Sequence, residues 1–412
     1  MYSLLTHEYF FYAIVAAISI GVYYARAAVS IGTGALACIA LVTVVQRGQF
    51  QRLLNSKYTI ALMSVFLVFL LSGINSANTQ EWLSRLGDNL PFLAVPAGVW
   101  AYGSLGKKQI SVSIGIFLVI TTLSSVIVIG DYLFHTEEYN QLYKVGKTIP
   151  TPIIHVRYSF FLALAAVLAA GLMLDDYIRV KWKRIALMAV GLWLIICVHI
   201  LAVRTGIFAL YGAVLTLGVL HTVYTRRWKV MLITFAGMTA MIVGSVLFLP
   251  SVSNKIQYVL HDLKVLREQG VSPEYSDNLR LISIIHGMEI FVDHPVAGVG
   301  VGDVEDEMQL KYEADTAMIP AERRFPPISQ YVFWLAAFGL LGTSALIGLL
   351  LFPVIRHGGK TYLLIGIYAL TGLSFLAETS IQLQLGKTVF VLLVAIIASG
   401  LAKLQERESN PV

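Results

Sequence analysis

Three arginines are the residues in this chain whose type and position best suit them to binding a charged substrate. Arg157 stands in HVRYSF, Arg204 in VRTG and Arg280 in SDNLRL, each at the end of an apolar run or of an expected helix. An arginine stays charged at any relevant pH, and its planar fork matches two phosphate oxygens at once. If the fold brings the three together, they would bind a pyrophosphate. Taken singly, each could instead snorkel at a membrane interface or pair with a loop acid.

Glu378, in FLAETSIQLQLGK, is the acidic residue that could act with these arginines. A carboxylate inside an apolar segment is costly, and it is a functional candidate for that reason. It could be a general base, a partner for one of the arginines or an acceptor for sugar hydroxyls. A purely structural ion pair is the alternative. His286 is a second candidate for proton transfer, against the alternative of a histidine on a helix face.

Gly298, Gly300 and Gly302 form a glycine-rich path that runs into four acids, GVGVGDVEDE. Such a path can cradle a phosphate when it follows a strand and opens a helix. Here it follows an expected helix that ends at a DHP tripeptide, so the context excludes a dinucleotide-binding motif or a P-loop. The sequence has no HExxH motif, no Cys/His cluster and no EF-hand spacing. We therefore predict no metal site and no cofactor.

The elements that position these residues must lie in a membrane. The 412 residues are 57% hydrophobic and 13% charged, about half the charged share of a soluble domain. The net charge of +6 is spread over short loops between apolar runs, so it does not indicate nucleic-acid binding. Cys38 and Cys197 both fall in apolar runs, which argues against a disulfide framework. The composition predicts an integral membrane protein with many spans, surrounded by membrane lipids.

Apolar runs long enough to be considered as crossings of a bilayer core of about 30 Å occur twelve times. They lie at 9–25, 27–45, 58–74, 90–105, 110–134, 156–175, 185–203, 205–225, 230–249, 328–353, 361–380 and 383–402. The predicted fold class is therefore all-α, a polytopic membrane protein with about 12 transmembrane helices.

Basic residues set the orientation of these spans, because cytoplasmic loops carry an excess of Lys and Arg. With a cytoplasmic N-terminus, the inside short loops hold more than twice as many of them as the outside ones. Both chain ends are then inside. Residues 251–327 form one large periplasmic loop, which needs helices of its own, expected at about 254–268 and 278–292. The predicted organisation is spans one to nine over 1–250, this helical loop, and spans ten to twelve with a cytoplasmic tail over 328–412.

Five sequence stretches occur in an order that resembles a known family. They are HVRYSF at the start of one span, VRTG between two spans, SDNLRLISIIHGMEIFVDHPVAGVGVGD in the long loop, PPISQYVFWLAAFGLLG at the next span and AETSIQLQLGKTVF near the end. Together they resemble the O-antigen ligase and polymerase superfamily of bacterial envelope glycosyltransferases. The resemblance covers roughly residues 155–400. Its most specific part is the glycine-rich stretch with the helix before it.

The resemblance implies an all-helical fold related to the metal-independent, lipid-donor glycosyltransferases of the GT-C type. It implies an active site on the periplasmic face of the bacterial inner membrane, serving lipopolysaccharide or other polysaccharide biosynthesis. The donor would be a glycan on a polyprenyl diphosphate such as undecaprenyl diphosphate. The acceptor would be a lipid A–core sugar for a ligase, or another lipid-linked glycan for a polymerase. By position, Arg204 matches the arginine of the family's R-x-G motif and Arg280 the arginine of its loop helix, and both would hold the donor diphosphate.

One position departs from the family pattern. Members commonly carry Pro-His-Asn before the span that follows the loop, and that histidine is tied to catalysis. Here the run is Pro327-Ile328-Ser329, and an isoleucine cannot move a proton. We therefore expect that Glu378 or His286 has taken the role, or that the acceptor differs. The sequence is compatible with both a ligase and a polymerase. A carrier of lipid-linked glycans is the non-enzyme alternative, which would predict repeated halves with paired broken spans that the sequence lacks.

Overall fold

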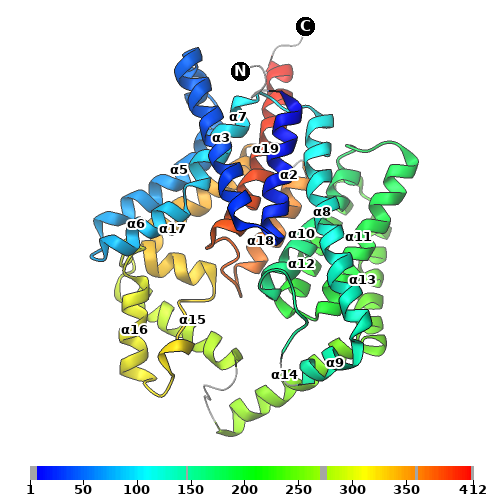
Figure 1. Ribbon diagram of the computed structural model, residues 1–412, viewed down its shortest axis with the longest axis vertical. Coiled ribbons are helices and arrows are strands. Elements are labelled where there is room, and N and C mark those ends of the chain that lie inside the picture. The colour runs from blue at the N-terminus through cyan, green and yellow to red at the C-terminus, as the bar shows by residue number, and fades with distance from the viewer. Residues whose placement is uncertain (1–6, 145–146, 270–275, 358–360, 410–412) are drawn as a thin grey trace.

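Helices make up every regular element of the described residues, as Figure 1 shows. The computed structural model describes residues 7–144, 147–269, 276–357 and 361–409. Within these ranges, nine helices are long and apolar enough to cross a membrane, which confirms the all-α, polytopic class. They are α3 (Arg26–Arg47), α5 (Lys57–Leu71, continued by η1), α8 (Lys107–Phe134), α10 (His155–Leu174), α11 (Lys181–Leu201), α12 (Arg204–Thr225), α13 (Trp228–Phe248), α17 (Gln330–Arg356) and α19 (Gln384–Ser409).

Three further predicted spans are helices that fall short of the roughly 20 residues needed to cross a bilayer. α2 (Glu8–Tyr23) has 16 residues, α7 (Pro91–Ala101) has 11 and α18 (Tyr362–Ser374) has 13. α7 begins at a proline, which favours the first helical position. α18 is short because the chain leaves the helix at Phe375 and continues through irregular turns up to α19. Apolar composition alone did not reveal where these helices stop.

Short helices connect the long ones. They are α4 (Phe50–Leu54), η1 (Ser72–Ile74), α6 (Thr79–Asp88), α9 (Thr136–Lys144), α14 (Pro250–Gln269), α15 (Ser276–Asp293), α16 (Val304–Asp315) and η2 (Ala321–Arg323). α14 and α15 match the two helices predicted in the large loop, whereas α16 has no counterpart in the prediction. The first turn of α16 carries Glu305, Asp306 and Glu307, and negative charge there favours a helix start.

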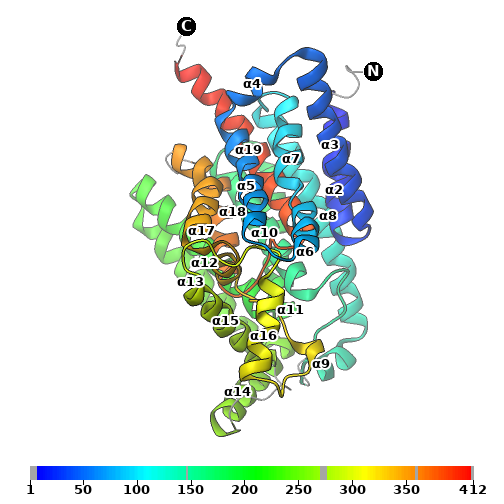
Figure 2. The ribbon, with the colours of Figure 1, turned by 90° about the vertical axis from the view of Figure 1, so that its left-hand side faces the viewer.

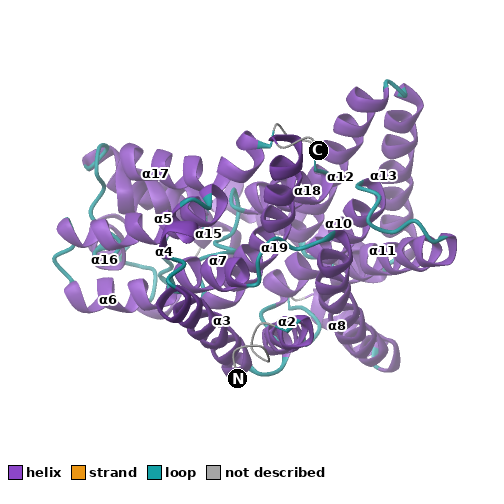
Figure 3. Cartoon of the chain, turned by 90° about the horizontal axis from the view of Figure 1, so that it is seen from above, coloured by secondary structure: helices purple, strands orange, loops and turns teal. Residues whose placement is uncertain are grey.

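α10 and α19 form the centre of the bundle. In each, 83% of the apolar window is buried inside the protein, against 6% in α13. Figure 3 shows the helices end-on, with α5, α16 and α17 on one side and α11, α12 and α13 on the other. An exposed apolar helix such as α13 fits a hydrocarbon surrounding, where no polar outer face is needed.

Contacts between distant segments sort the helix ends into two groups. At one end, the Asp175 carboxylate after α10 accepts the backbone N–H groups of Tyr362 and Leu363, both at 2.9 Å. At the other end, the side-chain amide of Asn78 donates to the Asp306 carboxylate at 2.8 Å. Figure 2 shows α4 at the first end and α14 and α16 toward the second. The charge pattern assigned the same segments to the same sides, while the compartment that each side faces stays a prediction.

The glycine-rich path docks the large loop onto a break in α17. The break lies at Gly339, which has φ +59° and ψ −166° inside an otherwise continuous helix. The Val299 N–H donates to the Ala336 carbonyl at 3.0 Å, so backbone pairs with backbone across the break. A Cβ atom at Gly298 would lie 2.4 Å from the backbone of Ala337. Only glycine permits so close an approach, and its φ of +68° also favours glycine.

The acids after the glycine path attach the loop to the segment around α6. Both carboxylate oxygens of Asp303 accept backbone N–H groups, one from Ala77 and one from Asn78, each at 2.7 Å. Arg85 forms a salt bridge with Glu305. These contacts join positions more than 200 residues apart and hold the start of α16 against the segment around α6.

Candidate functional site

Arg280 and Glu378 form an ion pair at the end of the bundle that carries the large loop. The Arg280 Nη1 atom lies 2.7 Å from the Glu378 Oε1 atom, and it also donates to the Ala377 carbonyl at 3.3 Å. Both side chains are mostly buried, with 32% and 17% of their surfaces exposed. Burial raises the strength of such a pair, and the loss of one partner would leave a poorly compensated charge.

The turn that carries Glu378 is held by the start of α17. The Gln330 N–H donates to the Phe375 carbonyl at 2.9 Å, and the Ser329 hydroxyl donates to the same carbonyl at 3.0 Å. The hydroxyls of Ser374 and Ser380 hydrogen-bond to each other at 3.0 Å, which closes the turn on itself. Glu378 is therefore carried by a fixed backbone even though no helix contains it.

Arg157, on another helix, lies within electrostatic range of the same carboxylate. It stands half-buried in the first turn of α10. The positive charge of Arg26, at the start of α3, repels the Arg157 guanidinium. Glu378 thus lies within electrostatic range of two arginines from α10 and α15, and a third cation lies nearby.

Arg204 lies at the same end of the bundle as the first residue of α12. Ala202, between the end of α11 and the start of α12, adopts the left-handed conformation with φ +50°. This conformation allows the two helices to meet almost without a loop. Two residues after Arg204, Gly206 packs against Ser159 of α10. Because Ser159 follows Arg157 by two residues, this contact places the exposed Arg204 and the half-buried Arg157 at one level of two neighbouring helices.

Further positive charge gathers around this position. His155 opens α10 and feels the charges of both Lys255, on α14, and Arg280. The N-termini of α10 and α12 add the partial positive charge of their helix dipoles. Arg280 and Arg157 thus lie within electrostatic range of the Glu378 carboxylate. Arg26 lies within range of Arg157, and His155 lies within range of Arg280 and Lys255. Such an arrangement suits a ligand with several negative charges.

His286 lies apart from this cluster, in the interface between α15 and α16. Its Nδ1 atom is 3.0 Å from a Glu289 oxygen, and its Nε2 atom is 3.2 Å from the Thr316 hydroxyl. The ring packs edge-on against Tyr312 at a centroid distance of 5.0 Å. Six residues of helix separate it from Arg280, a rise of about 9 Å. The structure therefore does not bring the two predicted proton-transfer residues, His286 and Glu378, together.

A metal ion could be held only by a group that includes this histidine, as far as the described residues reach. The ligand atoms of His286, Glu289 and Asp315 all lie within 4.8 Å of one another. Both ring nitrogens of His286 already have protein partners, so the histidine is satisfied without an ion. The carboxylate of Asp315 is exposed, as acids on a solvated loop often are.

Ile328, at the position where the family pattern described above has histidine, lies against Ser283, one helical turn after Arg280 on α15. Its backbone N–H donates to the Ser283 hydroxyl at 3.4 Å, and that hydroxyl donates to the Arg280 carbonyl at 2.8 Å. Position 328 is thus part of the site, but the isoleucine side chain offers no proton donor or acceptor. Glu378, predicted as a proton acceptor, is the residue that the structure pairs with Arg280.

Two cations, Arg26 near Arg157 and the buried Lys387, were not singled out from the sequence. The position of Arg26 at the very start of an apolar run was a signal. Lys387 lies inside the apolar run QLQLGKTVFVLL, and only 2% of it is exposed. Its Nζ atom donates to the Asp88 carbonyl at 2.9 Å and lies 5.8 Å from the Phe69 ring centroid. Lys387 therefore ties α19 to the end of α6.

Residues 189–347 match a family model described as O-antigen ligase. The matched region runs from α11 into α17, so it contains Arg204, Arg280 and the Ile328 position but neither Arg157 nor Glu378. A search of curated proteins found no match to the chain.

Proposed function

We propose that this chain, whose residues 189–347 match the O-antigen ligase family model, is a glycosyltransferase of the O-antigen ligase and polymerase superfamily with a lipid-linked donor. The donor is a glycan on a polyprenyl diphosphate, and the acceptor is a lipid A–core sugar or a related glycan. Transfer takes place at the end of the bundle that carries the large loop, on the periplasmic side of the inner membrane.

One observation carries this proposal. The carboxylate of Glu378 is paired with Arg280 and lies within electrostatic range of Arg157, so residues from α10, α15 and the turn after α18 share one location. A structural ion pair needs one arginine for one carboxylate. The surplus of positive charge here leaves capacity for an anionic ligand, and a diphosphate supplies more than one negative charge.

The arginines act on the leaving group. When the bond between the anomeric carbon and the diphosphate breaks, the electron pair stays on the diphosphate oxygen. Arg157, Arg204 and Arg280 hold that developing charge, and their forks remain protonated throughout. Groups placed in advance for a developing charge commonly supply several kcal/mol of barrier lowering. No metal ion is required for this role, because three guanidinium groups can provide the charge.

Glu378 takes the proton of the acceptor. As the acceptor hydroxyl oxygen bonds to the anomeric carbon, its proton passes to the Glu378 carboxylate. Before the donor binds, that carboxylate is occupied by Arg280. A bound diphosphate competes for the same guanidinium, so donor binding would release Glu378 to act as the base. This exchange makes the base available only when the leaving group is in place.

The proposal is tested by transfer assays with purified protein, a polyprenyl-diphosphate-linked glycan and each of the two acceptors. Arg280→Ala should reduce transfer by at least about a hundredfold, since one oxyanion-stabilising group typically contributes that much. Arg280→Lys should restore little, because an ammonium group cannot form the paired contact. Lys311→Ala is the matched control, since Lys311 also has one acidic partner on the same loop, at 2.8 Å. Near-full activity of Arg280→Ala would contradict the proposal.

A further inference from the structure

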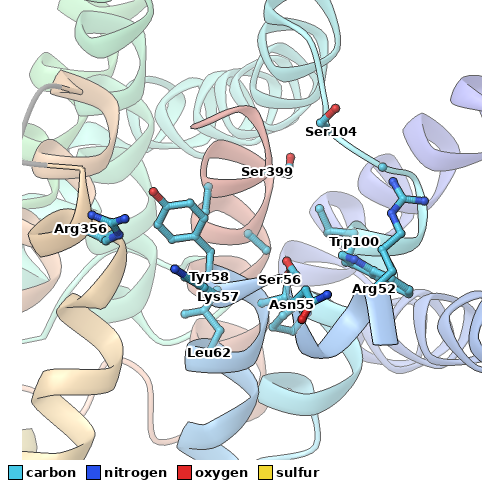
Figure 4. A pocket seen from close by; sticks show the side chains of 16 residues that line it. Arg52, Asn55, Ser56, Lys57, Tyr58, Leu62, Trp100, Ser104, Arg356 and Ser399 are labelled. Carbon is cyan, nitrogen blue, oxygen red and sulfur yellow. The ribbon is translucent and has the colours of Figure 1, made fainter. Parts of the chain in front are cut away.

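A cavity of about 750 Å³ lies where α4, α5, α7, α17 and α19 meet. Figure 4 shows side chains from these elements pointing toward a common space, with Arg52 on one side, Arg356 on the other and Lys57 between. The volume is within the range of about 300–1,000 Å³ that ligand sites occupy. The proposed glycosyl transfer makes no use of this cavity.

α17 separates the cavity from the Arg280–Glu378 site. Its first residue, Gln330, bonds to the turn that carries Glu378, and its last residue, Arg356, lines the cavity. The 17 residues from Leu340 to Arg356, beyond the break at Gly339, rise about 25 Å, and nine more helical residues precede the break. The helix is therefore long enough to reach across most of a bilayer core of about 30 Å. The two sites therefore face opposite membrane surfaces, and a diphosphate held at Arg280 cannot occupy the cavity.

The mouth of the cavity is basic. Arg52, Lys57 and Arg356 come from α4, α5 and α17, and all three are exposed. Arg52 donates to Gln49 at 3.2 Å, while Lys57 and Arg356 form no salt bridge with any residue that the structure describes. Of the sixteen lining residues, all of them described, none is acidic. Three cations converge here without a protein counter-charge among their described neighbours.

One wall of the cavity is apolar, beside polar side chains such as Asn55, Thr59 and Ser399. Leu62 of α5, Val99 of α7 and Ala398 of α19 are each at most 2% exposed, and Trp100 is 9% exposed. These residues continue along the membrane-crossing part of their helices, below the cations. A cationic mouth above an apolar wall matches an amphiphile, with a charged head and a hydrocarbon tail.

We propose that this cavity binds the phosphate headgroup of an anionic phospholipid. The headgroup lies among Arg52, Lys57 and Arg356, and the first part of an acyl chain lies along Leu62 and Ala398. A free phosphate would use the cations but would gain nothing from the apolar wall. The inner leaflet, which the basic loops of this end are expected to face, is the leaflet rich in anionic lipid headgroups.

The test uses the full-length protein in neutral detergent and native mass spectrometry with palmitoyl-oleoyl phosphatidylglycerol as the probe. Arg52→Gln/Lys57→Gln/Arg356→Gln should weaken the tightest binding event by about a hundredfold, because each basic side chain near a lipid headgroup contributes about fivefold. Arg226→Gln/Arg227→Gln/Lys229→Gln is the matched control, since it removes three exposed cations where α12 meets α13, two from the loop and Lys229 from the first turn of α13. Arg356→Gln alone, with about a fivefold effect, serves if the triple variant does not fold.

A second arm separates lipid from free phosphate. Ala398→Phe fills the apolar wall and leaves the cations in place, so it should weaken phosphatidylglycerol binding while millimolar inorganic phosphate competes poorly. Equal losses of phosphatidylglycerol affinity in the cavity variant and in the loop control would show that binding follows the general surface charge. That result would overturn the site. Effective competition by inorganic phosphate, with binding unchanged in Ala398→Phe, would overturn the lipid assignment. Neither outcome depends on glycosyl transfer.

Discussion

Gly206 lies so close to Ser159 that a Cβ atom at position 206 would come within 2.0 Å of the serine hydroxyl oxygen. This contact accounts for the glycine of the VRTG stretch in physical terms. The glycine lets α12 approach α10 closely, and the approach sets the spacing of Arg204 and Arg157, each two residues before the contact. The sequence element that resembles a family motif is thus a packing device that positions a charged side chain.

We expect Gly206→Ala to lower transfer by about ten- to a hundredfold, because a displacement of about 1 Å in a positioned group can cost that much. Ser159→Gly should restore part of the loss by making room for the new methyl group. Gly244→Ala on α13, where no atom lies within 4 Å of the added carbon, is the control and should leave transfer unchanged. Full activity of Gly206→Ala would show that the arginine spacing is unimportant.

Glu378→Gln separates a base from an ion-pair partner. If Glu378 accepts the acceptor proton, turnover at saturating donor should fall by about 10²–10⁴-fold. Donor affinity should hold or rise, because glutamine competes less for Arg280. Glu305→Gln, which breaks another arginine salt bridge at the same end, is the control. Weakened donor binding with unchanged turnover would remove the base assignment.

The bridge between Asp293 and Lys311 should make the large loop sensitive to acid. A hydrogen bond from Lys311 and its charge hold the pKa of Asp293 below its ordinary value of 3.8, and the same contact raises the pKa of Lys311. A carboxyl with a lowered folded-state pKa stabilises the fold above its ordinary pKa, and the contribution is lost as the pH falls through the folded-state pKa. Both groups are largely in solvent, so the effect is small.

Thermal unfolding from pH 7 to pH 3 measures this contribution. Asp293→Asn should have a lower midpoint than the unsubstituted chain at pH 7, and the two midpoints should converge as the pH falls below about 4. Asp315→Asn, on the same loop, serves as the comparison. A difference between Asp293→Asn and the unsubstituted chain that is as large at pH 3 as at pH 7 would mean that the bridge is not its source.

Cysteine labelling checks which surface faces which compartment. Cys38 is exposed and Cys197 is buried, so Cys38→Ser provides the background. In that background, Met318→Cys on the large loop should react with an impermeant reagent in intact cells, whereas Trp228→Cys should not. Both native side chains are about two-thirds exposed, at 67% and 63%, so accessibility within the protein does not bias the comparison. Labelling at position 228 would reverse the orientation.

The helical architecture was predictable because apolar runs of span length leave few alternatives in a membrane. The limits of those helices were not. α18 stops at Ser374 because the following turn is held from α17 by Ser329 and Gln330, and no local pattern in the sequence encodes that contact. The role of the glycine-rich path was also hidden. It depends on a break at Gly339, which in sequence is one glycine among many.

The site was predictable in part. Arginines at the edges of apolar runs were identified because a charge there is energetically costly in a membrane. The structure brings Arg280, Arg157 and Glu378 together because such charges need partners. His286 could not be placed by the same reasoning. Its Glu289 partner sits at helical spacing, but Thr316 comes from beyond a helix that the sequence did not reveal. Long-range packing decided which candidates share a location.

The distance in sequence between Arg280 and Glu378 also orders events during synthesis. The two residues are separated by 98 positions, which at about 5–20 residues per second corresponds to about 5–20 s of translation. During that interval Arg280 has emerged and its acidic partner does not yet exist. The cluster is therefore completed only once the last helices are made. A chain that ends before α18 would carry the basic groups without the carboxylate that balances them, and ribosome-stalled products of that length should remain open to protease.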